Sequence, residues 1–144
     1  MNKKKKVYIL IASICIIGII LFLLWPHKGG NTKHVNRNIM AVKVYSEEDI
    51  AGAMDIVEKK FKHDFDGCTL TDLWYDEAFS VSSSDGWAKQ YTAKEAIVLL
   101  SNFKVGPFGG DGSLNPNDTY TDWQWILVRD KDSRKWKLVT WGYG

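Results

Sequence analysis

The sequence predicts an α+β fold: one N-terminal amphipathic helix packed on a curled antiparallel sheet of about four strands, preceded by a single transmembrane helix. Three observations lead to this class. Residues 7–25 carry no charge, residues 46–65 show one apolar stripe at helical spacing, and four later segments are rich in β-branched and aromatic residues. A helix followed by strands is typical of an antiparallel sheet with its helix on one face.

The apolar run at residues 7–25 is long enough to cross a bilayer. Nineteen helical residues at about 1.5 Å each reach about 28 Å. We therefore expect an uncleaved signal-anchor, with the lipid bilayer as the partner of this segment. A cleaved signal peptide, or a lipoprotein signal that uses Cys15, is the alternative. It is less favoured because the run exceeds a usual h-region and no Ala-x-Ala site follows it.

The basic residues around this run indicate the orientation. The stub at residues 1–6 holds four lysines next to the span, and the segment at 26–44 is a polar, basic linker. By the positive-inside rule, the stub is expected in the cytoplasm. The domain at residues 45–144 is then expected outside, on a single-pass protein of the cell membrane.

Charge and length exclude several classes of protein. The first 44 residues carry a net charge of +8 and the last hundred carry −6. An acidic domain does not suit nucleic acid, because phosphates require a basic face. A hundred residues can bury one core but cannot hold two domains, which excludes large multidomain enzymes and multi-span transporters.

Residues 46–65 are expected to form the helix that covers the sheet. Ser46 can cap its N-terminus, and the acidic residues that follow suit the helix dipole. Asp66 and Gly67 end it. The apolar stripe consists of Ile50, Met54, Val57 and Phe61.

Four strands are expected after this helix, at residues 68–75, 96–105, 120–129 and 136–141. The sequence between the first two reads as a polar loop at 76–84 with a Ser-Ser-Ser run, then a short helix around 87–91. A glycine-rich loop fills 106–118. Strand alternation places Trp123, Trp125, Leu127 and Arg129 on one face of the third strand, and Tyr120, Ile126 and Val128 on the other.

The third strand also supplies a candidate ligand pocket. Trp123, Trp125 and Arg129 offer an apolar wall and a fixed positive charge, which suit an anionic or aromatic ligand. Asp72, in the middle of the first strand, is a fourth candidate, either as a buried carboxylate or facing water. The alternatives are a core filled with aromatic side chains and an Arg129 that lies over Trp125 as a cation–π pair.

No metal, cofactor or catalytic residue is expected. The loop at 111–122 has oxygen side chains at calcium-loop spacing, but Pro116 stands where that loop needs glycine. His63 is the only histidine past the linker, and a single histidine at a helix end is better explained by the helix dipole. The sequence contains no nucleophile elbow, P-loop or dinucleotide fingerprint.

Several motifs nevertheless resemble a known group of proteins. They are Gly67–Tyr75, Ala96–Phe103, Trp123–Arg129 and Gly142–Gly144. On these motifs, residues 46–144 resemble a membrane-anchored domain family of unknown function from Gram-positive bacteria. The resemblance implies a cone-shaped α+β fold, similar to the nuclear-transport-factor-2-like (NTF2-like) and cystatin-like group. It implies no activity and no functional residues.

Two functions stay open. The first is a membrane-tethered extracytoplasmic binding or interaction module that holds a protein or wall-associated partner. The second is a small-molecule enzyme or ligand-binding protein of the cone-fold group, with an aromatic-lined pocket. Such enzymes usually place an acid–base pair in the pocket, and the only histidine of this domain lies on its first helix. The first function is therefore favoured over an enzyme.

Overall fold

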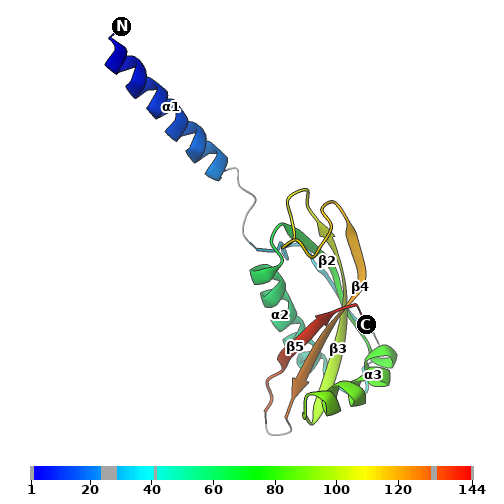
Figure 1. Ribbon diagram of the computed structural model, residues 1–144. Helices are drawn as coiled ribbons and strands as arrows, with labels where there is room; N and C mark the ends of the chain where they lie inside the picture. Colours follow the sequence, from blue (N-terminus) through cyan, green and yellow to red (C-terminus); the bar gives the residue numbers. More distant parts are fainter. Residues whose placement is uncertain (1, 24–28, 41, 131–132, 144) are drawn as a thin grey trace.

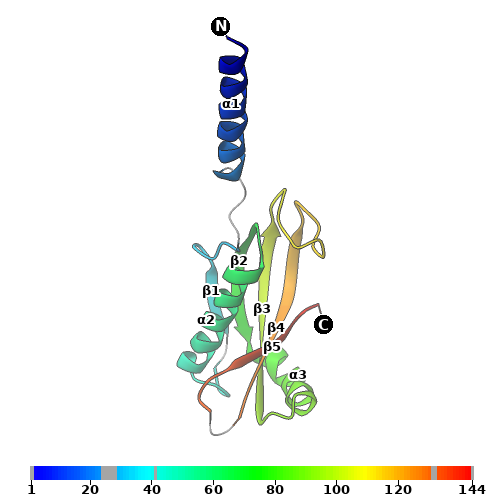
Figure 2. The same ribbon diagram turned by 60° about the vertical axis from the view of Figure 1, so that its left-hand side comes forward.

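The computed structural model describes residues 2–23, 29–40, 42–130 and 133–143. It contains an N-terminal helix and an α+β domain with one open, five-stranded mixed sheet (Figures 1 and 2). The elements in chain order are α1 (Lys3–Leu23), β1 (Asn36–Met40), α2 (Glu47–Asp64), β2 (Cys68–Asp76), α3 (Glu77–Gln90), β3 (Glu95–Val105), β4 (Thr119–Arg129) and β5 (Lys137–Gly142).

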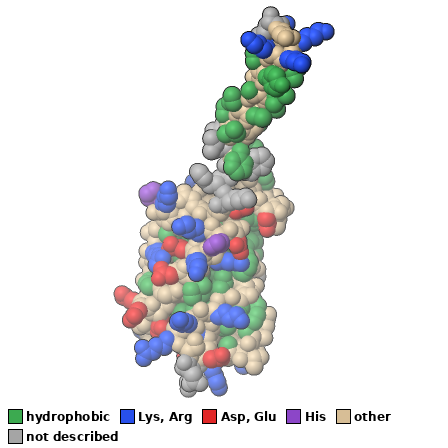
Figure 3. Space-filling model, turned by 90° about the vertical axis from the view of Figure 1, so that its left-hand side faces the viewer, with side chains coloured by type: hydrophobic (Ala, Val, Ile, Leu, Met, Phe, Trp, Pro, Cys, Tyr) green, Lys and Arg blue, Asp and Glu red, His purple; other side chains and the backbone are tan. Residues whose placement is uncertain are grey.

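Helix α1 has the length and composition of a membrane span. None of its apolar segment is buried against other parts of the chain, and Figure 3 shows apolar side chains along it with lysines at its N-terminal end. The helix begins at Lys3, inside the predicted basic stub, because lysine is a good helix former. Residues 24 and 25, the predicted end of the span, lie outside the described residues. These features fit a membrane anchor or a signal sequence.

The sheet has one strand more than the sequence predicts, and it is mixed. Its order is β1-β2-β3-β4-β5, in which β1 runs parallel to β2 and the other pairs are antiparallel. The extra strand comes from residues 26–44, which were expected as a linker. Of the five residues of β1, only Ile39 is partly buried. An edge strand with one apolar contact shows no alternation, so sequence analysis missed it.

The predicted amphipathic helix is confirmed as α2. The Ser46 side chain caps it by accepting a hydrogen bond from the Asp49 N–H at 3.1 Å. Its buried stripe packs on one face of the sheet, against large side chains of β2, β3 and β4. The buried residues of the helix are Ile50, Ala53, Met54, Val57 and Phe61.

Helix α3 replaces the loop predicted at 76–84. Asp76 caps it by accepting from the Phe79 N–H at 3.1 Å. The hydroxyls of the serine run donate to carbonyls one turn earlier, as from Ser82 to Phe79 at 2.7 Å, so they are satisfied within the helix. Figure 1 shows α3 on the opposite side of the sheet from α2. Both faces are therefore covered, and Ala88 of α3 packs on Val128 and its neighbours.

A bulge in β4 changes which side chains share a face. The pairing with β3 shifts between Ser101 and Phe103, and Asp122 has a φ of 54°. As a result, Tyr120 lies on the α2 side with Trp123, at a ring-centroid distance of 5.7 Å. The prediction that Tyr120 points to the other face is wrong, because simple alternation holds only in an unbroken strand.

Candidate functional site

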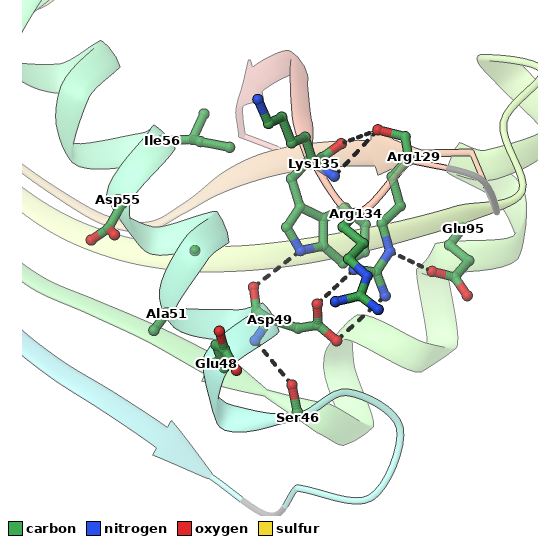
Figure 4. Close-up of a pocket in the computed structure, with 13 residues that line it drawn as sticks. Ser46, Glu48, Asp49, Ala51, Asp55, Ile56, Glu95, Arg129, Arg134 and Lys135 are labelled. Atoms are coloured by element: carbon green, nitrogen blue, oxygen red, sulfur yellow. Dashed lines mark hydrogen bonds and ion pairs between the residues drawn. The ribbon is translucent and has the colours of Figure 1, made fainter.

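A cleft of about 850 Å³ lies between the first half of α2 and the connection from β4 to β5 (Figure 4). Seven of its thirteen lining residues carry charged side chains, and Ser46, Ile56 and Trp136 are among the others. The acidic ones are Glu48, Asp49, Asp55 and Glu95, and the basic ones are Arg129, Arg134 and Lys135. The cleft therefore presents both signs of charge, and we call it the Arg129 cleft.

Arg129 is held from two sides. Its Nε donates to Glu95 Oε2 at 2.6 Å, and its Nη1 donates to Asp49 Oδ1 at 2.7 Å. The Arg129 side chain is 13% exposed, whereas the two carboxylates are 34% and 35% exposed. Its guanidinium carbon lies 4.2 Å from the ring centroid of Trp136. This arrangement combines two charge-assisted hydrogen bonds with a cation–π contact.

Secondary structure brings these groups together. Glu95 and Arg129 are cross-strand partners at the paired ends of β3 and β4. Asp49 lies in the first turn of α2, where the helix dipole favours a negative charge. Trp136 Nε1 donates to the Asp49 backbone carbonyl at 3.0 Å. The network thus joins the N-terminus of α2 to the sheet.

The same contacts set the charge states in the cleft. The hydrogen bond from Arg129 holds the pKa of Asp49 below its usual range. Burial lowers the pKa of Arg129, but its bonds to Asp49 and Glu95 outweigh this effect, so the pKa is raised. Burial raises the pKa of Tyr45 to about 12, and its hydroxyl donates to the Ala96 carbonyl at 3.1 Å. At neutral pH, Asp49 and Arg129 are charged and Tyr45 is neutral.

The structure does not bring the four predicted site residues into one place. Trp125 is fully buried, and its Nε1 donates to Ser101 Oγ at 2.8 Å. Trp123 is partly buried at the other end of β4. Asp72 precedes the core residue Leu73, so its side chain points to the opposite face of the sheet. Of the four, Arg129 alone lines the cleft.

Two of the displaced candidates lie in different surroundings, one polar and one largely aromatic. Asp72 accepts from the Thr71 hydroxyl at 2.8 Å and from the Asn36 amide of β1 at 3.5 Å. The indole N–H of Trp123 is buried and has no hydrogen-bond partner among the residues that the structure describes. A small cavity of about 170 Å³ beside Trp123 is lined also by Phe65 and Trp141. Neither site adjoins the Arg129 cleft.

Sequence analysis missed three members of the cleft network: Asp49, Glu95 and Trp136. Asp49 was explained by the helix dipole alone, and Glu95 lies at the very start of a strand. The sequence does hold a signal for this network, because Glu95 directly precedes one predicted strand and Arg129 ends the next. To recognise these two as partners, however, one must know the register of β3 and β4. Arg129 makes its cation–π contacts with Trp136 at 4.2 Å and with Tyr45 at 5.6 Å, whereas the sequence-based alternative named Trp125.

Several polar side chains of the glycine-rich loop at 106–118 form hydrogen bonds within the loop. Asp111 accepts from the Ser113 backbone N–H at 3.0 Å, and Asn115 donates to Asp118 at 3.4 Å. Among the residues that the structure describes, no three His, Cys, Asp or Glu side chains gather as metal ligands would.

The class defined by these observations is an α+β domain with a five-stranded mixed sheet, behind one apolar helix that fits a membrane span. The chain matches no family model, no curated protein and no solved structure. The resemblance to the Gram-positive domain family and to the NTF2-like fold therefore stays a prediction.

Proposed function

We propose that this chain is a membrane-anchored binding module, in which α1 holds the protein in the cell membrane and the domain presents the Arg129 cleft to a partner outside. The observation that carries this proposal is α1 itself. Its apolar side chains are not covered by any described part of the chain. In water such a surface is unfavourable, whereas a bilayer solvates it on every side.

The charges around α1 support the proposed orientation. The lysines at positions 3–6 precede the apolar residues directly, which favours a cytoplasmic N-terminus. The domain that follows is acidic, and it is then outside the cell. The resemblance to membrane-anchored domains of Gram-positive bacteria agrees with this layout.

The walls of the cleft support binding of a polar partner. Arg134 and Lys135 lie on the side of the β4–β5 connection, and Glu48 and Asp55 lie on α2 (Figure 4). Charges at the rim of a binding site mainly speed the encounter of the two partners and fix their relative position. They add less to the affinity. A polar segment of a protein, or a wall-associated polymer, with charges of both signs matches this surface.

The geometry favours binding over acid–base catalysis. Both ends of the Arg129 guanidinium already bond to Asp49 and Glu95. His63 is in the last turn of α2, fourteen residues beyond Asp49, which is about 21 Å along a helix at 1.5 Å per residue. A proton transfer between the histidine and the cleft carboxylates would require direct contact or one bridging water. The histidine is therefore not part of this site.

Two measurements on intact cells test the proposal. Protease added outside should digest the domain while residues 1–23 stay in the membrane fraction. A photo-crosslinking amino acid at Arg134 should capture a partner, whereas the same group at Val81 should not. Val81 is a suitable control because it is 46% exposed but lies on α3, on the face of the sheet opposite the cleft. A protease-protected domain, or equal adducts from both positions, would contradict the proposal.

A further inference from the structure

The chain enters the domain at a fixed point. The Gly30 N–H donates to the Lys62 carbonyl at 3.1 Å, and the Gly67 N–H donates to the Gly29 carbonyl at 3.3 Å. The Gly29 N–H also donates to the Asp66 carboxylate. Residue 29 is therefore attached where α2 ends and β2 begins, and this attachment defines the end of the domain nearest to α1.

The distance from this point to the end of α1 is short. Leu23 ends the helix and Gly29 is the sixth residue after it, so the chain between them spans at most about 22 Å at 3.6 Å per residue. When α1 crosses a bilayer, the entry point of the domain is held within that distance of the membrane surface.

The loop at 106–118 is braced against the same entry point. The Gly106 N–H donates to the Gly67 carbonyl at 3.0 Å, and the Gly110 N–H donates to the Asp66 carbonyl at 2.7 Å. A Cβ at Gly109 would lie 2.6 Å from the Gly67 oxygen, so only glycine permits this approach. Figures 1 and 2 both show the loop at the end of the domain where the connection from α1 arrives.

Phe108 lies at the surface of this loop, and little of it is covered by the part of the chain that the structure describes. It follows Pro107 and precedes the braced Gly109, and its side chain is 80% exposed. An exposed phenylalanine alone is unremarkable. Here it is held at the one end of the domain that the anchor keeps near the membrane, where the interface accepts aromatic side chains.

We infer that the loop at 106–118 is a second membrane contact, in which Phe108 inserts into the interface of the bilayer that α1 spans. This inference rests on the proposed anchoring by α1. Insertion is shallow, because Asp111 follows three residues later and its hydrogen bonds from Ser113 hold its pKa below the usual range, so it stays charged. The two contacts together limit the rotation of the domain on its anchor.

The test uses the full chain in phosphatidylcholine vesicles. Cys15→Ser leaves Cys68, which is buried and whose pKa is raised to about 11 by burial, so it does not react at neutral pH. A fluorophore at Pro107→Cys, an exposed position next to Phe108, reports on the inserted part of the loop, and one at Val81→Cys reports on the exposed surface of α3. Iodide quenches only fluorophores that are in water.

The expected result is that iodide quenching is several-fold weaker at position 107 than at position 81. Phe108→Asp should remove this protection, whereas Phe108→Leu should keep it. If the chain floats with the vesicles and position 107 is quenched as strongly as position 81, the loop contact is wrong and the anchor stands. If the chain does not float with the vesicles, the anchoring itself fails and the loop contact fails with it.

Discussion

The two helices of the domain cover opposite faces of one sheet with different chemistry. Under α2 the contact consists of large apolar side chains, such as Phe61 against Phe103 and Trp125. Under α3 it consists of a smaller cluster, with Ala88, Ala96 and Val128 buried and Trp87 partly buried, and a hydrogen bond in which Ser80 Oγ accepts from the Val98 N–H at 3.0 Å. The free energy gained by burying apolar side chains is proportional to the area buried. The α2 face should therefore contribute most of the stability.

The largest expected loss of stability comes from removing β1, the strand at one edge of the sheet. Three apolar residues before α2 pack partly against its core, namely Val35, Ile39 and Val42. A fragment of residues 45–144 loses them and exposes an edge of β2, so it should be less stable than residues 29–144 by about 4 kcal/mol or more. Urea unfolding of both fragments measures this, and equal midpoints would mean that β1 adds nothing.

The second-largest loss of stability is expected from truncating a core side chain on the α2 face. Phe61 is fully buried and stacks on Phe65 with the ring centroids 4.6 Å apart. Phe61→Ala should lower the free energy of unfolding by about 3–5 kcal/mol through lost burial and the cavity that remains. Val81→Ala on exposed α3 should change it by less than about 0.5 kcal/mol. A loss below about 1 kcal/mol for Phe61→Ala would show that this face is not the main core.

The Arg129 network should contribute less than the core. Arg129→Met leaves Asp49 and Glu95 unpaired, and because both are about one-third exposed, the expected loss at pH 7 is about 2 kcal/mol. Arg37→Met is a matched control, since Arg37 also pairs with two carboxylates but is 35% exposed. It should cost less than about 1 kcal/mol. Equal losses in urea unfolding would contradict the role of burial.

The Arg129 contribution should also depend on pH. In the folded chain Arg129 lowers the pKa of Asp49, so the stabilisation is complete above the usual aspartate pKa of about 3.9. It is lost as the pH falls through the lowered value. The difference between the wild type and Arg129→Met should therefore shrink between pH 5 and the acid end of the urea titration. A difference that grows on acidification would contradict this linkage.

The smallest effect is expected on the α3 face. Ser80→Ala leaves the buried N–H of Val98 without its acceptor, which should cost about 1–2 kcal/mol. Ser82→Ala is the control, because the Ser82 hydroxyl is exposed and bonds only to its own helix. It should change stability by less than about 0.5 kcal/mol. If Ser80→Ala is as neutral as its control, the α3 face is held by packing alone.

The sequence by itself determined the elements whose signal is local. The apolar run of α1, the capped stripe of α2 and the strands β2 to β5 all show periodicities that follow from the geometry of one helix or one strand. These predictions agree with the structure to within a few residues at each end of the elements. A helix stripe or a buried strand needs no partner in order to be recognised.

Only the tertiary structure decided the remaining features, because each depends on contacts between distant segments. The polar strand β1 exists since β2 offers it an edge, and the serine-rich α3 is fixed by its bond to Val98. Because of the bulge at Asp122, Tyr120 packs against the core on the α2 side. The Arg129 cleft depends on the register of β3 and β4 and on the placement of Asp49. None of these pairings is encoded in the spacing of residues along one element.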